Sequence, residues 1–299
     1  MSGTAPDPRA ILGALGWSEG MRTIAPVEGG MAAALWRVEH GEQTYALRLF
    51  KVGEAAVARR EEHAMRLVVP GVPIPAVRAA GAWENRPVLL IDWCAGQTLL
   101  AALRAAPQRA WALAQAFGAT QARLHAAAPP ADLREDGRSW IDWKGGGAGA
   151  LGERLRAVAS AEPSILHLDY HPLNVMMDAG RVSGLIDWAN VHVGDRRADV
   201  ARTLTLLLLA PLPPDGSVRL IRAASRILAT GWRRGYRSVA GPLGGMAPFY
   251  AWAGTALLND FAPRVDQPGG WLRATHLDPA RRWTAHWRAR AGLPATDDG

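Results

Sequence analysis

The stretch SILHLDYHPLNVMMD, residues 164–178, gathers two histidines, an aspartate, a proline and an asparagine between apolar flanks. Its polar residues are too irregularly spaced for a helix, and the proline among them argues the same way. Two apolar runs, 175–177 and 182–186, are separated by a short turn sequence, which predicts a β-hairpin. Because a hairpin brings its two ends together, Asn174 at the entrance and Asp187 at the exit are expected to lie side by side.

An amide oxygen and a carboxylate offered to one point are hard oxygen ligands. Such ligands suit Mg²⁺, which takes few protein ligands and completes its octahedron with phosphate oxygens and water. Asp169, on the loop just before the hairpin, is then free to orient a substrate hydroxyl and accept its proton. These residues predict a phosphoryl-transfer centre with Asp169 as the catalytic group and with Asn174 and Asp187 as metal ligands.

Composition places the chain among globular proteins, since 49% of its 299 residues are apolar and 20% are charged. A single cysteine, Cys94, excludes an internal disulfide framework and fits a reducing cytoplasm. We expect no signal peptide and no membrane span, because the longest apolar run is far too short. The net charge of +7 comes from arginines spread among acidic residues, all but two of the 34 basic residues being arginine. A solvated surface explains this pattern better than a nucleic-acid track.

The first part of the chain is expected to be rich in strands. Alternating patterns predict strands over 23–27, 34–39, 44–50, 76–82 and 87–93, with one helix over 54–69. After residue 95 the pattern becomes helical, which predicts a boundary between an N-terminal lobe, 1–94, and a C-terminal lobe, 95–299. The helices expected there cover 98–105, 109–128, 148–160, 197–210, 218–239, 246–261 and 280–291. The glycine run 145–149 is expected to be a mobile loop.

The spaced motifs His167-x-Asp169-x-x-x-x-Asn174 and Ile186-Asp187-Trp188 resemble the catalytic loop and metal motif of the aminoglycoside phosphotransferase and choline kinase family. The resemblance extends from about residue 23 to residue 209. It implies an α+β, two-lobed protein-kinase-like fold, with a small antiparallel-sheet N-lobe that has one helix and a larger, mostly helical C-lobe. It makes Asp169 the catalytic base and His167 a structural residue of the loop.

The same resemblance assigns further residues to the nucleotide. Gly29 and Gly30 fall where such kinases fold backbone amides over phosphates, although a plain turn explains them equally well. Arg48 stands where protein kinases carry a lysine, with Glu61 as its partner, and His171 faces the transferring phosphate or packs beneath it. The stretch 89–96 matches the purine-reading hinge. It would use the carbonyl of Asp92 and the amide of Cys94, whose side chain is expected to be a small buried hydrophobe.

The stretch that follows the metal motif also resembles the family. Asp195 is expected to cap the following helix, and Asp199 to bond the catalytic loop.

The resemblance thus implies a Mg²⁺-dependent phosphotransferase that moves the γ-phosphate of ATP, or of GTP, to a hydroxyl of a small molecule. Aminoglycosides, other antibiotics and small alcohols are all candidates. A polycationic acceptor would need an acidic pocket, but Asp142, Asp260 and Asp266 are scattered in the sequence. Trp140, Trp143, Trp188 and Trp252 are candidates to stack on a sugar or aglycone, although most of the 13 tryptophans are expected to lie in the core.

Two alternatives remain open. A nucleotide-binding adaptor without turnover is favoured by the arginine at position 48 and by the sparse glycine loop. A metal-dependent hydrolase would use the alternation of His167, Asp169 and His171, but the sequence offers no distant ligand cluster.

Overall fold

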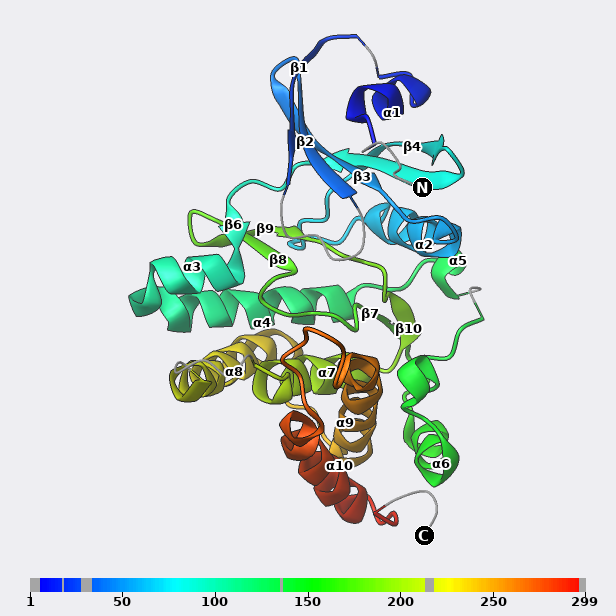
Figure 1. Ribbon diagram of the computed structural model, residues 1–299. Helices are drawn as coiled ribbons and strands as arrows, with labels where there is room; N and C mark the ends of the chain where they lie inside the picture. Colours follow the sequence, from blue (N-terminus) through cyan, green and yellow to red (C-terminus); the bar gives the residue numbers. More distant parts are fainter. Residues whose placement is uncertain (1–5, 18, 28–33, 135–136, 213–217, 296–299) are drawn as a thin grey trace.

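A five-stranded antiparallel sheet forms one end of the molecule (Figure 1). The computed structural model describes residues 6–17, 19–27, 34–134, 137–212 and 218–295. The strands, in spatial order, are β1 (Met21–Pro26), β2 (Ala34–His40), β3 (Gln43–Leu49), β5 (Arg86–Asp92) and β4 (Val77–Trp83). All five predicted strands form, with bounds within two residues of those expected. The predicted glycines Gly29 and Gly30 lie outside the described residues.

The two faces of this sheet carry different partners because side chains alternate along each strand. Leu47 and Leu49 of β3 pack in a cluster with Ile11 and Leu12 of helix α1 (Pro8–Ala14). Ala46 belongs to a second cluster, which includes side chains of helix α2 (Ala55–Met65). Because side chains two residues apart on a strand point to the same face, residue 48 lies on the same face as Ala46, which is the face toward α2.

Helix α1 is an addition to the single N-lobe helix expected from the sequence. Its start carries a recognisable signal, since the Asp7 side chain accepts a hydrogen bond from the amide of Arg9 at 2.9 Å and Pro8 occupies the first turn. A helix of seven residues offers only two buried apolar positions, Ile11 and Leu12. This is too little periodicity to detect in a sequence.

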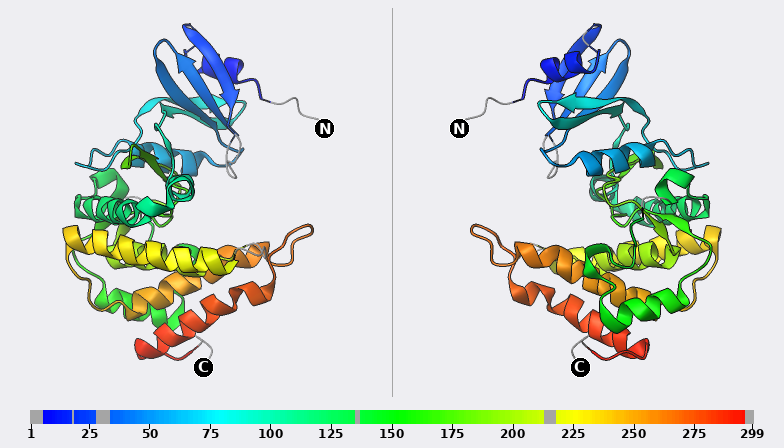
Figure 2. Two further views of the ribbon diagram at one scale, coloured as in Figure 1. Left: turned by 90° about the vertical axis from the view of Figure 1, so that its left-hand side faces the viewer. Right: turned by 90° about the vertical axis from the view of Figure 1, so that its right-hand side faces the viewer.

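The rest of the chain is mostly helical (Figures 1 and 2). Its helices are α3 (Leu99–Ala105), α4 (Ala110–Ala126), α5 (Ala131–Arg134), α6 (Gly149–Val158), α7 (Arg196–Leu209), α8 (Val218–Ala240), α9 (Ala247–Phe261) and α10 (Asp278–Arg290), with 3₁₀ turns at Pro107–Arg109, Trp143–Gly145, Ala262–Arg264 and Ala274–Leu277. Five short strands join them: β6 (Gln97–Thr98) pairs with the hairpin β8 (Val175–Asp178) and β9 (Arg181–Leu185), while β7 (Ser164–Leu166) pairs with β10 (His192–Gly194). The mixed α+β, two-lobed arrangement is the one predicted.

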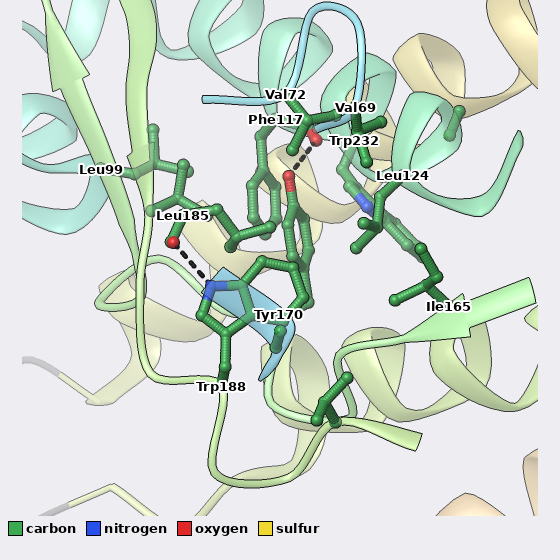
Figure 3. Close-up of a cluster of buried hydrophobic side chains, with 14 of the residues drawn as sticks. Val69, Val72, Leu99, Phe117, Leu124, Ile165, Tyr170, Leu185, Trp188 and Trp232 are labelled. Atoms are coloured by element: carbon green, nitrogen blue, oxygen red, sulfur yellow. Dashed lines mark hydrogen bonds between the residues drawn. The ribbon is translucent and has the colours of Figure 1, made fainter. Parts of the chain in front are cut away.

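A buried cluster joins the helices to the segment 164–188 (Figure 3). Tyr170 stacks on Phe117 of α4 with ring centroids 4.4 Å apart, and its hydroxyl donates to the Phe117 carbonyl at 2.7 Å. Trp188 is fully buried and donates from Nε1 to the carbonyl of Leu185 at 2.9 Å. Burial of each such aromatic side chain contributes roughly 1.5–3 kcal/mol. The segment 164–188 is therefore held in place by its own apolar residues, which pack in the core.

The glycine run expected to be a mobile loop is closely packed, which corrects that prediction. Gly146 lies against the indole of Trp252, and Gly147 lies against Ile141, so that a Cβ at either position would overlap its neighbour. The Trp252 Nε1 donates to the Ile141 carbonyl at 2.8 Å. Gly146 is thus required where the backbone approaches a buried tryptophan, and Gly147 where it approaches Ile141.

Gly96 joins β5 to β6, and we predict that it tolerates no side chain. Its φ of +86° is left-handed, and a Cβ there would overlap the Met177 carbonyl of β8. We expect Gly96→Ala to destabilise the protein by about 1–3 kcal/mol, measured by denaturant unfolding. Gly41→Ala is the matched control, because Gly41 has a φ of +60° with no atom within 4 Å. Equal losses in the two variants would show that the contact with β8 contributes nothing.

Candidate active site

The loop between β7 and β8 presents Asp169 and His171 while burying the residues around them. Leu168 has a left-handed φ of 58°, and it is fully buried together with Tyr170. The side chains of Asp169 and His171 keep 24% and 23% of their surface exposed. The alternation follows from the apolar residues on either side, which are held in the core.

His167 holds this loop to the end of the hairpin, as the resemblance predicted. Its Nε2 lies 3.1 Å from the carbonyl oxygen of Ile186, and its Nδ1 lies 3.3 Å from the amide nitrogen of Asp169. Because a carbonyl only accepts and an amide only donates, the ring proton belongs on Nε2. Both ring nitrogens are thus used, and the ring is buried.

The hairpin brings Asn174 and Asp187 to the same end of the sheet, as the sequence predicted. The Asn174 carbonyl accepts from the Ile186 amide at 3.0 Å, directly before Asp187. The Asn174 Nδ2 donates to the Asp169 carbonyl at 3.0 Å and lies 3.3 Å from the Asp169 Oδ2. Since its nitrogen is used in this way, the side-chain oxygen of Asn174 remains available as a ligand.

The two carboxylates of this site have no lysine or arginine partner among the described residues. Asp169 has only His171 as an ion-pair neighbour, with Nε2 and Oδ1 3.5 Å apart. Asp187, at a left-handed φ of 63°, forms no hydrogen bond or ion pair within the described part of the chain. In a protein with 34 basic residues this is unusual, and it fits a site whose cation is a metal. The donor set of carboxylate and amide oxygens is one that Mg²⁺ accepts.

His171 is held close to Asp169 in its neutral form. Its Nδ1 lies 3.2 Å from the amide nitrogen of Leu173, which places the ring proton on Nε2. Burial lowers the pKa of His171, although the nearby charge of Asp169 opposes the shift. The ring can therefore donate a hydrogen bond toward Asp169 without adding a full positive charge.

A buried polar network supports the loop from below. Asp199, fully buried in α7, accepts from the Leu168 amide at 2.6 Å, as predicted, and its other oxygen lies 2.9 Å from the His125 Nε2. Burial pushes the pKa of Asp199 upward, but the hydrogen bond from His125 holds it below its ordinary value. The His125 Nδ1 lies 2.8 Å from the Tyr236 hydroxyl of α8.

Neither His125 nor Tyr236 was predicted from the sequence. Each stands on a helix far from the motif, and a lone histidine in a helix carries no local signal. Asp195 was predicted correctly as a cap, since it accepts from the Arg197 amide at 2.9 Å at the start of α7.

Arg48 and Glu61 form the predicted pair between β3 and α2. The guanidinium binds the carboxylate through two nitrogens, with the Nη2 and Oε1 atoms 3.1 Å apart and the Nη1 also hydrogen-bonded to Oε2. The planar guanidinium of arginine can make this bidentate contact, whereas the single ammonium nitrogen of lysine cannot. Arg60, on the same helix, lies 3.4 Å from the Ala189 carbonyl, just after Asp187.

Glu61 gives a pH-dependent contribution to stability. Burial raises its pKa from 4.5 to about 7, although Arg48 opposes the shift. Between these two values the native state holds a proton that the unfolded state has lost, so this contribution falls as pH rises from about 4.5 to 7. We expect wild type to lose stability relative to Glu61→Gln across this range, measured by denaturant unfolding at pH 5 and pH 8. A difference that does not change with pH would contradict this assignment.

The segment 89–96, which resembles the purine-reading hinge, contacts the hairpin formed by β8 and β9. Asp92 uses its side chain to bind Arg78, with Nε and Oδ1 2.7 Å apart. The Cys94 amide has no hydrogen-bond partner among the described residues, which leaves it available to a ligand. The Cys94 side chain lies against Gly184 of β9, and burial raises the pKa of its thiol to about 11. The thiol is therefore neutral and acts as a packing group, although Cys94 is half-buried rather than buried as predicted.

The described residues do not support the metal-dependent hydrolase considered above. They contain no group of three or more histidine, cysteine, aspartate or glutamate side chains able to hold a metal ion. His167, which that alternative would use, has both nitrogens engaged and is buried. Nor does any helix in the described ranges combine the length and hydrophobicity needed to cross a bilayer.

The five-stranded sheet, the helical part and the loop between β7 and β8 define a two-lobed protein of the kinase-like class. The sequence profile of the phosphotransferase enzyme family matches residues 23–241, which is most of the chain. The chain therefore belongs to the phosphotransferase enzyme family. No significant match is found among curated protein sequences.

Three solved structures illustrate the similarity of fold. A thermostable mutant of aminoglycoside phosphotransferase APH(4)-Ia, in complex with AMP-PNP and hygromycin B, is 16% identical with a TM-score of 0.63, covering 95% of this chain and 98% of its own. An aminoglycoside-3'-phosphotransferase of type VIII is 19% identical with a TM-score of 0.59, covering 84% and 98%. Spectinomycin phosphotransferase APH(9)-Ia is 10% identical with a TM-score of 0.53, covering 81% and 82%. At these identities the likeness concerns the fold alone.

Proposed function

We propose that this phosphotransferase uses Mg²⁺ and ATP to phosphorylate a hydroxyl group of a small molecule. The observation that carries the proposal is a pair of carboxylates without a lysine or arginine partner among the described residues. Asp169 is hydrogen-bonded to Asn174, and Asp187 directly follows the Ile186 amide that donates to the Asn174 carbonyl. Asn174 and Asp187 would hold the metal, and the metal would neutralise charge on the nucleotide phosphates.

In this proposal the chain's own residues position the reactants. Arg48, held by Glu61, would contact the phosphates, and the Cys94 amide with the Asp92 carbonyl would bind the purine. Gly29 and Gly30 keep their proposed place over the phosphates, and His171 would steady Asp169. Asp169 would align the acceptor hydroxyl for in-line attack and accept its proton. Residues 1–94 would form the nucleotide-binding lobe and residues 95–299 the catalytic and substrate lobe.

The test is a screen followed by a transfer assay. Alcohols, amino sugars and macrolides would be screened for thermal stabilisation of the protein with AMP-PNP and Mg²⁺, and each hit would be assayed for uptake of labelled γ-phosphate from ATP. Transfer to an acceptor supports the proposal. Binding of nucleotide with neither transfer nor slow hydrolysis would favour the adaptor alternative, in which Arg48 has replaced a catalytic lysine. We place the protein in the cytoplasm on the same proposal, since ATP is found there.

A further inference from the structure

A second charged cluster lies beneath the catalytic loop, on the helical side. Arg202 of α7 is 1% exposed, and its Nε lies 3.3 Å from the carbonyl of Leu168, the residue before Asp169. Its Nη2 donates at 2.7 Å to the Oδ2 of Asp260, at the end of α9. The positive charge of Arg202 also helps to lower the pKa of His171. The Arg202 guanidinium therefore lies close to the catalytic loop that carries Asp169 and His171.

One nitrogen of this guanidinium has no hydrogen-bond partner. The Nη1 of Arg202 is buried and donates to no described atom, and it is the one buried side-chain atom of this kind in the described part of the chain. The guanidinium lies 5.0 Å from the centre of the Trp143 ring, which is half-buried. A buried charged donor without an acceptor is costly, so its presence points to a ligand that is not part of the chain.

Lys144 brings a second cation to the same carboxylate. Its Nζ lies 3.1 Å from the Oδ1 of Asp260, while 42% of its side chain remains exposed. Its backbone takes a left-handed φ of 52°, and its carbonyl accepts from the Asn259 Nδ2 at 2.7 Å. Although burial pushes the pKa of Asp260 upward, Arg202 and Lys144 hold it below its ordinary value. One carboxylate is thus shared by two cations, which leaves a net positive charge.

The acidic residues considered for a polycationic acceptor are all neutralised. Besides Asp260, Asp142 lies 3.1 Å from the Nη2 of Arg156, and Asp266 lies 3.7 Å from the Nε of Arg273. Asp266 belongs to the loop between α9 and α10, which projects from the helical part of the molecule (Figure 2). None of these three carboxylates is free to attract an amine, so a polyamine would meet the positive charge of Arg202 and Lys144 there.

We propose that the acceptor is a hydroxyl compound that carries an anionic group such as a carboxylate, bound by Lys144 and Arg202 with Trp143 against its body. This inference rests on the proposed phosphotransferase function. The acceptor hydroxyl gives its proton to Asp169, its oxygen forms a bond to the γ-phosphorus, and the bond from that phosphorus to the bridging oxygen breaks to release ADP. The anionic group anchors the acceptor while its hydroxyl turns toward Asp169.

The experiment compares acceptors that share one skeleton and differ in charge. Glucuronate, glucose and glucosamine form one set, glycerate, glycerol and 3-aminopropane-1,2-diol form a second, and hygromycin B is the polycationic probe. Phosphate transfer from ATP would be measured for each, with nucleotide binding followed separately by calorimetry. We expect the acid of at least one set to be the preferred acceptor. In Lys144→Gln the KM for that acid should rise about tenfold, the effect of losing one charge-assisted hydrogen bond.

Arg154→Gln is the matched control, since Arg154 is an exposed basic residue of α6. It should leave the KM unchanged. Preference for glucosamine, for the amino diol or for hygromycin B would overturn the inference, as would failure of every acid while nucleotide still binds. An unchanged KM in Lys144→Gln would overturn it as well. Loss of nucleotide binding itself would instead refute the proposed function, so the two failures can be told apart.

Discussion

Asp169→Asn is expected to abolish most phosphate transfer while leaving nucleotide binding intact. The substitution keeps the shape of the side chain, but it removes the group that would accept the proton of the acceptor. General-base catalysis of this kind contributes roughly 10²–10⁴-fold, and we expect kcat to fall by about that factor. Because the Asp169 side chain contacts only Asn174 and His171 among the described residues, the loop should keep its structure. Steady-state transfer and calorimetric titration with AMP-PNP would measure the two quantities.

Asp178→Asn is the control for this variant, since Asp178 is an exposed carboxylate at the turn of the same hairpin. It should retain wild-type turnover. A loss of nucleotide affinity in Asp169→Asn as large as the loss of kcat would contradict the separation of roles. It would mean that Asp169 holds the nucleotide rather than the acceptor.

Asp187→Asn should weaken binding of the metal-nucleotide complex, whereas Asp169→Asn acts on the acceptor. Asparagine is chosen because Asp187 has a φ of 63°, a backbone conformation that asparagine tolerates better than alanine. Removing a direct ligand should weaken Mg²⁺-dependent nucleotide binding by at least the roughly 10–100-fold that loss of an outer-shell partner costs. Titrating AMP-PNP with and without Mg²⁺ would reveal the loss.

The most specific measurement is the change in AMP-PNP affinity when Mg²⁺ is added. In wild type Mg²⁺ should tighten AMP-PNP binding, and in Asp187→Asn it should have little effect. Asp169→Asn, titrated in the same way, supplies the matched comparison because it keeps a carboxylate at position 187. If Mg²⁺ tightens binding equally in both variants, Asp187 is not a metal ligand.

The parts of the site that the sequence predicted are those governed by local rules. Hairpin geometry predicted Asn174 and Asp187 at one end of the hairpin, and in the structure the Asn174 carbonyl accepts from the amide of Ile186, the residue before Asp187. The family resemblance paired Arg48 with Glu61, and period two places Arg48 on the side of the sheet where α2 supplies that glutamate. In both cases a short stretch of chain carries the signal.

The parts that the sequence did not predict depend on contacts between distant segments. His125 contacts Asp199 across 74 residues, and no local pattern in the sequence marks His125 for this contact. The pairing of β7 with β10 involves strands of three residues, too short for a periodic signal. The packing of Gly146 depends on the position of Trp252, which comes more than 100 residues later in the chain. Tertiary packing, rather than propensity, sets each of these features.

In the proposed site, Asn174 and Asp187 hold a single metal ion beside Asp169. Crystals grown with Mn²⁺ and AMP-PNP would test it directly, since Mn²⁺ can replace Mg²⁺ among oxygen ligands and gives an anomalous signal. The account predicts one or more anomalous peaks, with one peak about 2.0–2.3 Å from both the Asn174 side-chain oxygen and an Asp187 carboxylate oxygen. Nucleotide density between the lobes with no peak touching these two side chains would contradict it.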